Sequence, residues 1–358
     1  MRSESASRPP MVLVVSRVVD GGDAPEKGVE RYEAIVEDLR KGGFLAERVA
    51  VSGMSQLYGA FDRYGPDMAF CSFHRFEGAG SSDARLMEAC IASGIAWIGS
   101  TTETMDLALS KPRMKDRLRR CGIPTPDWLV VSKKADGSIE GLEILEAARD
   151  FPYIVKPANE GNSRGIDDGS VVRAPHDLFV RASLIAEEYG EAIVERYVSG
   201  GDDSREFTVA MIGNGADAIV SPVEISRRRA RSLVITEEDK ESEAVMAAPI
   251  DDERLKAEVG RLARKVFLAS GARDYARCDI LFHEDKLYAI EMNGQPIVPD
   301  SWFAACSREV GLDEPQYINA IALAAIAENA RSGHALVSIP RGIARLLPRD
   351  VFERLARS

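Results

Sequence analysis

One stretch of the chain, residues 276–302, restricts the possible folds more than any other; it reads ARCDILFHEDKLYAIEMNGQPIVPDSW. Side-chain type alternates with a period of two residues both before and after a polar segment at residues 283–286. This pattern predicts two antiparallel strands joined by a turn. In such a hairpin, Asp279, Glu291 and Asn293 can point to the same face of the sheet. Two carboxylates and an amide oxygen suit Mg²⁺ or Mn²⁺, usually shared with substrate phosphates. The alternative interpretation is an acidic, solvated hairpin edge.

A second motif, residues 151–166, reads FPYIVKPANEGNSRGI and predicts a short buried strand followed by a loop. The strand ends at Lys156, because Pro157 has no N–H group to continue a ladder. Gly161 and Gly165 bound the loop, whose backbone N–H groups can curl around an anion while the lysine adds a point charge. The pattern is neither G-x-x-x-x-G-K-[ST] nor G-x-G-x-x-G, so neither of those nucleotide-binding folds is indicated.

Four segments occur in a fixed order along the chain: LALSKPRMKDRLRRCGIPTP, IVKPANEGNSRGI, IVERYVSGGDDSREFTVAMIGN and RCDILFHEDKLYAIEMNGQP. Together they resemble the ATP-grasp superfamily and, within it, the D-alanine–D-alanine ligase family. The resemblance runs over residues 72–328. It implies a mixed α/β and α+β fold, in which an N-terminal parallel α/β domain precedes two α+β subdomains that clamp ATP between their sheets. We therefore expect the chain to divide into residues 1–100, 101–191, 192–333 and a C-terminal extension at 334–358.

The composition excludes several functions and locations. A formal net charge of −11 argues against nucleic acid or an anionic membrane as the main partner, because both need a positive surface. The N-terminal residues are polar, and no stretch is long and apolar enough to span a bilayer. Five scattered cysteines without a C-x-x-C pair fit a reducing cytoplasm. We expect small-molecule substrates, an amino acid or small carboxylic acid, and leave a homodimer open.

The resemblance also implies which residues bind the nucleotide. Lys111 and Lys156 would contact the phosphates. Glu195 would accept a hydrogen bond from the adenine amino group, backbone atoms up to Val198 would meet the ring edge, and Glu206 would hold the ribose hydroxyls. The candidates for the apolar walls of the adenine slot are Ile154, Leu281 and Ile290. For these three, a place in the ordinary hydrophobic core is an equal alternative.

The reaction implied by the resemblance is carboxylate activation. ATP passes its γ-phosphoryl group to a carboxylate, an amine attacks the acyl phosphate, and phosphate leaves, with two Mg²⁺ (or Mn²⁺) ions between the phosphates. Arg277 would stabilise the oxyanion, unless it only forms a salt bridge to Asp279 or Glu291. Ser163 lies in the phosphate loop. Lys240, in a long polar segment at residues 221–249 that contains several arginines, would contact the γ-phosphate from a mobile lid.

The departures from the family concern the amino-acid site. The early S-x-E-x-x-V-S motif is replaced by SRVVDGGDAPEKG, and S-P-G-M after the metal asparagine is replaced by residues 295–298, QPIV. The two serines of the phosphate loop are replaced by Asn162–Ser163, and the lid tyrosine has no counterpart. We therefore predict a ligase of this reaction type for substrates other than two D-alanines. The alternatives are a D-alanine–D-alanine ligase with a divergent site, an inactive ATP-binding protein, and a carboxylase-type enzyme, for which no carrier-like segment is present.

Overall fold

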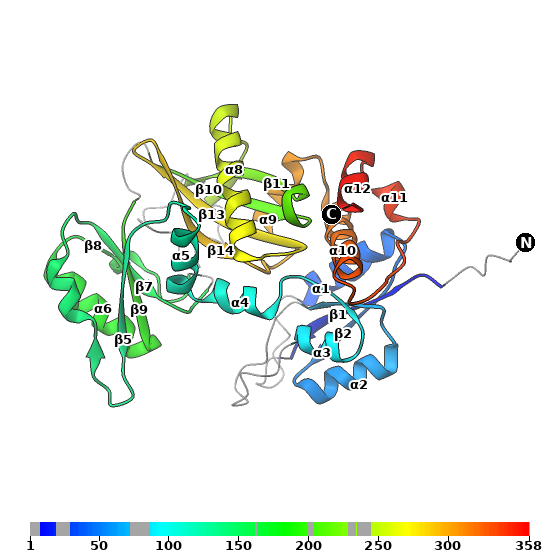
Figure 1. The fold of residues 1–358 in the computed structure, drawn as a ribbon, viewed down its shortest axis with the longest axis horizontal. Coiled ribbons are helices and arrows are strands. Elements are labelled where there is room, and N and C mark those ends of the chain that lie inside the picture. Colours follow the sequence, from blue (N-terminus) through cyan, green and yellow to red (C-terminus); the bar gives the residue numbers. More distant parts are fainter. Residues whose placement is uncertain are drawn as a thin grey trace, which may run out of the picture.

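The computed structural model describes residues 8–18, 29–71, 86–161, 163–198, 204–227, 234 and 245–357. These residues form three sheets, which Figure 1 shows spread along the long axis of the molecule. Their strand orders are β2-β1-β3-β4, β6-β5-β9-β7-β8 and β12-β11-β10-β13-β14. The first sheet is parallel and the other two are antiparallel, so the predicted mixture of α/β and α+β architecture is confirmed.

The first sheet is parallel because its strands are covered by helices on both faces. The continuous apolar run of the first strand sends Val12 and Val14 toward Ile35 of the first helix. Its alternate residues Leu13 and Val15 pack in a separate cluster with residues of the next two helices. The elements are β1 (Met11–Arg17), β2 (Leu45–Val51), β3 (Met68–Cys71) and β4 (Ala96–Ile98), with α1 (Val29–Lys41), α2 (Met54–Tyr64) and α3 (Leu86–Ala92).

The second sheet carries one long helix, α6, whose Leu178, Ala182 and Ile185 are buried against the strands. The elements are β5 (Trp128–Lys133), β6 (Ile139–Glu140), β7 (Tyr153–Pro157), β8 (Val171–Val172), α6 (Pro175–Tyr189) and β9 (Glu191–Arg196). The chain between β6 and β7 contains a 3-10 helix, Leu142–Ala147. Before β8, residues 168–170 form a 3-10 turn, because the Asp167 and Ser170 side chains cap each other's backbone N–H groups and curl the chain.

The third sheet contains the hairpin expected from the sequence, β13 (Tyr275–His283) and β14 (Lys286–Asn293). Its turn residues Glu284 and Asp285 have φ values of 49° and 58°, as a two-residue turn that follows the strand twist requires. The other elements are β10 (Arg205–Ile212), β11 (Ile219–Arg227), β12 (Val245–Ala248), α8 (Glu253–Ser270) and α9 (Ser301–Glu309). α8 begins after Asp252, whose carboxylate accepts the N–H groups of Arg254 and Leu255.

The remaining helices join the sheets. α4 (Thr102–Leu109) and α5 (Lys111–Arg120) connect the first sheet to the second. α10 (Glu314–Arg331) is buried along most of its length between the first and third sheets. The C-terminal extension packs on the body of the protein through α11 (Ile343–Leu346) and α12 (Arg349–Leu355). Arg354 of α12 donates hydrogen bonds to the carbonyl oxygens of Asp217 and Ala218, at 2.5 and 3.0 Å.

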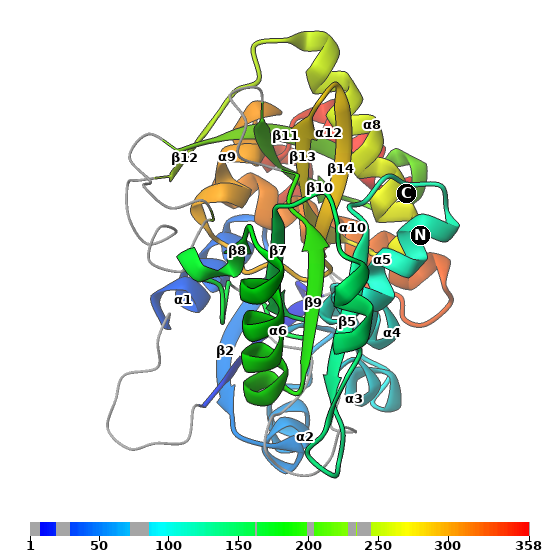
Figure 2. The same ribbon diagram turned by 90° about the vertical axis from the view of Figure 1, so that its left-hand side faces the viewer.

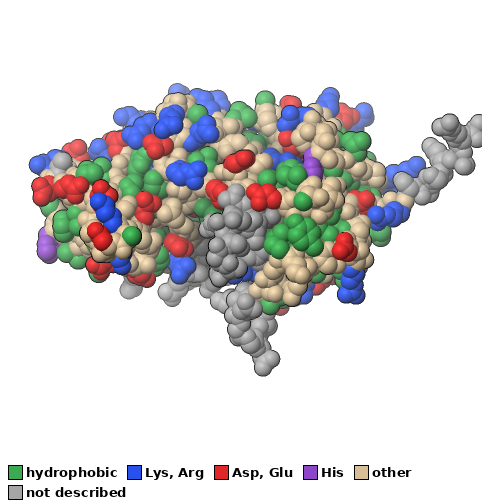
Figure 3. All heavy atoms as spheres, turned by 60° about the horizontal axis from the view of Figure 1, so that its bottom comes forward, with side chains coloured by type: hydrophobic (Ala, Val, Ile, Leu, Met, Phe, Trp, Pro, Cys, Tyr) green, Lys and Arg blue, Asp and Glu red, His purple; other side chains and the backbone are tan. Residues whose placement is uncertain are grey.

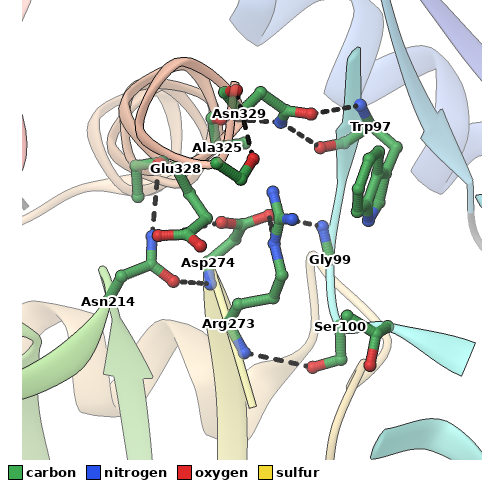
Figure 4. A network of polar contacts seen from close by, with 12 residues as sticks. Trp97, Gly99, Ser100, Asn214, Arg273, Asp274, Ala325, Glu328 and Asn329 are labelled. Carbon is green, nitrogen blue, oxygen red and sulfur yellow. Dashed lines mark hydrogen bonds and ion pairs between the residues drawn. The ribbon is translucent and has the colours of Figure 1, made fainter. Parts of the chain in front are cut away.

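A network of buried hydrogen bonds links the first sheet to the third, as Figure 4 shows. Asp274 Oδ2 accepts the Gly99 N–H at 2.8 Å, and Asn214 Nδ2 donates to Asp274 Oδ1 at 3.2 Å. Asn329 of α10 donates to the Trp97 carbonyl at 2.9 Å. Because buried polar groups are costly when unpaired, these bonds specify one relative position of the two sheets.

On the face of the molecule shown in Figure 3, acidic and basic side chains are interspersed. None of the helices in the described ranges is long and apolar enough to cross a membrane.

Candidate active site

A cleft of about 860 Å³, open to solvent, lies between the second and third sheets. Figure 2 shows β7 and β9 in front, with β10, β13 and β14 behind and above them. Many of the residues expected to bind the nucleotide or the metal line this one cleft, from both sheets: Ile154, Lys156, Ser163, Glu195, Val198, Glu206, Asp279, Leu281, Ile290 and Glu291. An apolar lining with a few convergent polar groups is typical of a small-molecule site.

The hairpin places its oxygen donors opposite one another. Asp279 pairs with Glu291 across the two strands, and Arg277 pairs with Asn293. The register shifts by one residue between Asp279 and Ile280. This bulge breaks the strict alternation of side chains, so that the consecutive residues Ile290 and Glu291 both line the cleft.

The chemistry of the donors fits a hard divalent cation. Thr208 Oγ1 donates a 2.7 Å hydrogen bond to Asp279 Oδ1 and orients this carboxylate. Burial raises the pKa of Asp279; Arg277 opposes the rise and Glu291 adds to it. Two partly buried carboxylates that face each other are favourable only with positive charge nearby, which a bound cation would supply. The described residues contain no group of three His, Cys, Asp or Glu side chains that could hold a metal, so the donor set expected from the sequence would need the Asn293 amide as its third member.

Arg277 is held from three directions. Its guanidinium lies 3.7 Å from Asp279 and 3.2 Å from Asp300, and it stacks on the Trp302 ring at 5.1 Å. The salt bridge to Asp279 considered as the alternative from sequence is therefore present. It does not exclude a role in the reaction, because the arginine stays next to the carboxylates of the cleft.

A buried carboxylate with two lysines forms the floor of the cleft on the side of the second sheet. Glu195 Oε1 lies 3.0 Å from Lys156 Nζ, and Glu195 Oε2 lies 3.1 Å from Lys115 Nζ. Burial tends to raise the pKa of Glu195, but the two lysines outweigh it, so the pKa is lowered. Burial lowers the pKa of Lys115 to about 8. The cluster holds Lys156 rigidly at the cleft wall.

A family model described as "D-ala D-ala ligase C-terminus" matches residues 118–322, more than half of the chain. The chain belongs to the D-alanine–D-alanine ligase family. The D-alanine–D-alanine ligase of Verminephrobacter eiseniae is 30% identical over 68% of this chain and 70% of its own length. That of Francisella philomiragia is 26% identical over 85% of this chain and 96% of its own length.

The fold of this D-alanine–D-alanine ligase family member also matches a solved structure. The D-alanine–D-alanine ligase from Bacillus anthracis, complexed with ATP, is 20% identical and covers 90% of this chain and 100% of its own. The TM-score is 0.70. The ATP-grasp fold expected from the sequence is confirmed, and the chain is an ATP-grasp ligase of the class that forms carbon–nitrogen bonds and releases ADP.

Some site residues expected for the D-alanine–D-alanine ligase family lie outside the lining of the cleft. Arg277 and Asn293 lie next to it on the hairpin. Lys111 is 8% exposed, and its ammonium donates to the Glu160 carbonyl. Burial lowers the pKa of Lys111, while Glu291 opposes this decrease. Lys111 therefore lies near Glu291 of the cleft, although its ammonium group contacts the backbone carbonyl of Glu160.

Lys240, expected to contact the γ-phosphate, lies outside the described residues, as do Asn162 of the phosphate loop and the arginines at positions 228, 229 and 231. Val234, from the same long segment, lines the cleft.

The sequence interpretation missed other residues of the cleft region. Lys115 follows Lys111 by one helical turn on α5, and this spacing was an available signal that the two share a face. No local sequence pattern indicated that Trp302 lines the cleft, because the loop after β14 brings this residue there. The other missed lining residues are Pro126, Ile166 and Ile280.

Proposed function

We propose that this ligase joins two D-amino acids at the expense of ATP, with D-alanine as the first candidate substrate. The γ-phosphoryl group passes to the carboxylate of one amino acid, the amine of the other attacks the acyl phosphate, and phosphate leaves. The observation that carries the proposal is that Lys156 on β7 and Glu291 on β14 line one cleft. Positive groups and oxygen donors from two sheets can thereby meet on one triphosphate.

Both sheets contribute to the adenosine end of the cleft. Ile154, Leu281 and Ile290 supply apolar walls for the adenine ring, and backbone atoms near Val198 meet its edge. Glu195 keeps lone pairs beyond its two lysine contacts, so its carboxylate can also accept the adenine amino group. Glu206, on β10, is placed in the same cleft for the ribose hydroxyls.

The phosphate end is the part around Asp279 and Glu291. Asp279, Glu291 and Asn293 would hold Mg²⁺ or Mn²⁺, and two ions sharing the phosphates fit this donor set. A bound cation supplies charge stabilisation of the transferring phosphoryl group. Lys156 on β7 and Ser163 in the loop after it would contact the phosphates.

Arg277 is the side chain that would stabilise the oxyanion formed at the reacting carbonyl. Its guanidinium is fixed by Asp300 and Trp302, so little reorganisation is needed when an oxyanion forms. Asp279 keeps it beside the phosphate end.

Other amino acids are the second candidate substrates. The loop after Asn293 departs from the family's S-P-G-M, and Trp302 presents an aromatic ring to the cleft. The names of the relatives nevertheless favour D-alanine over the unrelated small acids that these departures suggested.

We also propose that residues 1–100, 101–191 and 192–333 act as three domains, with the first helping to hold the amino acids. A cytoplasmic enzyme acting on small molecules, with a homodimer as one possible assembly, fits this function.

The test is ADP release by the purified chain with ATP, Mg²⁺ and D-alanine, with mass spectrometry of the product. The expected product is D-alanyl-D-alanine, absent with L-alanine or after chelation of the metal. ADP release with another D-amino acid alone would favour the second candidate. ATP binding without ADP release from any amino acid in a panel would contradict catalysis.

A further inference from the structure

The loop after β7 has a backbone conformation that needs support from its surroundings. Ser163 has a φ of 62° and Gly165 a φ of 73°, and this left-handed region is unfavourable for a serine. The Ile166 N–H donates to the Ser163 carbonyl at 3.0 Å. No side chain fits at Gly165, because a Cβ there would lie 2.6 Å from Cγ of Pro157. Backbone of this kind persists only where neighbouring groups hold it in place.

One side chain of α6 holds this loop through three contacts. Arg181 Nη2 donates to the Gly165 carbonyl at 3.2 Å and to Ser170 Oγ at 3.0 Å. The same atom lies 3.0 Å from Asp167 Oδ1. The Asp167 side chain is 62% exposed, whereas Ser170 is buried. The hydrogen bonds to Gly165 and Ser170 therefore hold the loop more firmly than the ion pair does, because solvent screens exposed ion pairs.

The hydrogen bond from Arg181 sets the direction of a whole peptide group. In a trans peptide the C=O and the N–H point in opposite directions. Anchoring the Gly165 carbonyl on the guanidinium therefore also directs the Ile166 N–H, which in turn holds the Ser163 carbonyl. The orientation of Ser163 depends in this way on an arginine of another element.

Arg181 and the loop lie on different surfaces of the protein. Ser163 and Ile166 line the nucleotide cleft. Arg181 instead lines a separate, open groove together with Val171 and Val172 of β8. Any effect of Arg181 on a bound nucleotide must therefore pass through the loop.

We propose that Arg181 is a positioning residue for the phosphates of ATP, because it fixes residues 163–166 in the form that receives them. The inference rests on the proposed function, which places the phosphates beside Lys156 and Ser163. Without the guanidinium, the Gly165 peptide can rotate and Ser163 loses its fixed orientation. The adenine slot should not change, because its proposed walls Ile154, Leu281 and Ile290 lie on strands.

The experiment measures the affinities of MgATP and of adenosine by calorimetry. Arg181→Met should weaken MgATP binding by about tenfold or more, the equivalent of one hydrogen bond to a charged group, and leave adenosine binding unchanged. Arg181→Lys keeps the charge and one donor group, so it should recover part of the MgATP affinity. Arg173→Met, at an exposed arginine that lines the same groove, is the matched control and should leave both affinities unchanged.

An unchanged MgATP affinity in Arg181→Met would overturn the inference. An equal loss for MgATP and adenosine would also overturn it, because such a loss reports a general change of the fold. So would the same loss of MgATP affinity in Arg173→Met, which would reflect only the charge of the groove.

ADP release by the wild-type chain with D-alanine separates this inference from the proposed function. Release of ADP, together with an unchanged MgATP affinity in Arg181→Met, supports the proposed function and overturns this inference. A loss of affinity confined to MgATP, without ADP release from any amino acid in a panel, supports the role of Arg181 and contradicts ligation.

Discussion

The Oγ of Ser100 donates a 2.6 Å hydrogen bond to the carbonyl oxygen of Gly294, the residue that follows Asn293. The hydroxyl also accepts the Arg273 N–H at 3.3 Å, so one buried side chain joins the end of the first sheet to both ends of the hairpin. The approach is close: a Cβ on Gly294 would lie 3.0 Å from the Met105 sulfur. The proposed metal site is thus held in place by contacts with the N-terminal part of the chain.

Ser100→Ala should therefore destabilise the protein. It leaves the buried Gly294 carbonyl without its partner, which costs about 1–3 kcal/mol. The free energy of unfolding in urea measures this loss. Ser93→Ala, at an exposed position after α3, is the matched control and should change it by less than about 0.5 kcal/mol. Equal stability of the two variants would show that the bond contributes little.

Asp279→Asn and Glu291→Gln should abolish turnover while preserving the fold. The amide versions keep the shape of the side chains, and the amide oxygen of the first variant could still accept the Thr208 hydroxyl, but both lose the charge that holds a cation. Removing several kcal/mol of charge stabilisation corresponds to a loss of about 10³-fold or more in kcat. ADP release against Mg²⁺ concentration, with circular dichroism as the check on folding, tests this. Glu253→Gln, in the first turn of α8, is the control, and near-normal turnover in either hairpin variant would refute the metal assignment.

Lys115→Met should move acid unfolding to a higher pH. The folded-state pKa of Glu195 is lowered, so its ion pairs contribute stability that is present above the unfolded pKa of about 4.3 and lost as pH falls through the folded value. With one lysine removed, less positive charge opposes the effect of burial on Glu195, so its folded pKa rises. The stability is then lost at a higher pH during acidification. Breaking a buried pair also costs about 3–5 kcal/mol near neutral pH.

Circular dichroism as a function of pH measures that midpoint. The control is Lys134→Met, which removes an ion pair to Glu140 in which the two side chains are 50% and 58% exposed, and which should leave the midpoint in place. A midpoint for Lys115→Met that equals the wild type would mean that Lys156 alone stabilises the Glu195 carboxylate.

Arg277→Lys should reduce kcat more than it raises KM for ATP. Lysine keeps the charge but loses the planar fork that Asp300 and Trp302 hold, so the oxyanion loses an oriented donor. Losing one such donor costs about 10²–10³-fold in kcat. Steady-state kinetics at saturating ATP measures the effect, with Arg254→Lys, at a side chain that is 90% exposed, as the control. A change confined to KM for ATP would assign Arg277 to nucleotide binding instead.

The hairpin and the end of β7, within one residue of Lys156, follow from local features of the sequence. Alternation with period two, a polar turn and a proline that cannot continue a ladder depend on neighbouring residues only. The fold class and most residues that line the cleft were predicted from the family resemblance. The local features did not predict the bulge beside Asp279, because a shift of register depends on packing of the partner strand.

The tertiary structure decided which distant groups meet. Gly99 and Asp274, which are 175 positions apart, are joined by a buried hydrogen bond, and Lys115 reaches Glu195 from another element of the fold. Trp302 reaches the cleft only because the loop after β14 is anchored on the N-terminal part of the chain by Ser100 and the Cys71 carbonyl. Periodicity shows which face of an element is buried, but not what covers that face. Contacts between segments far apart in the chain depend on how the three sheets pack together.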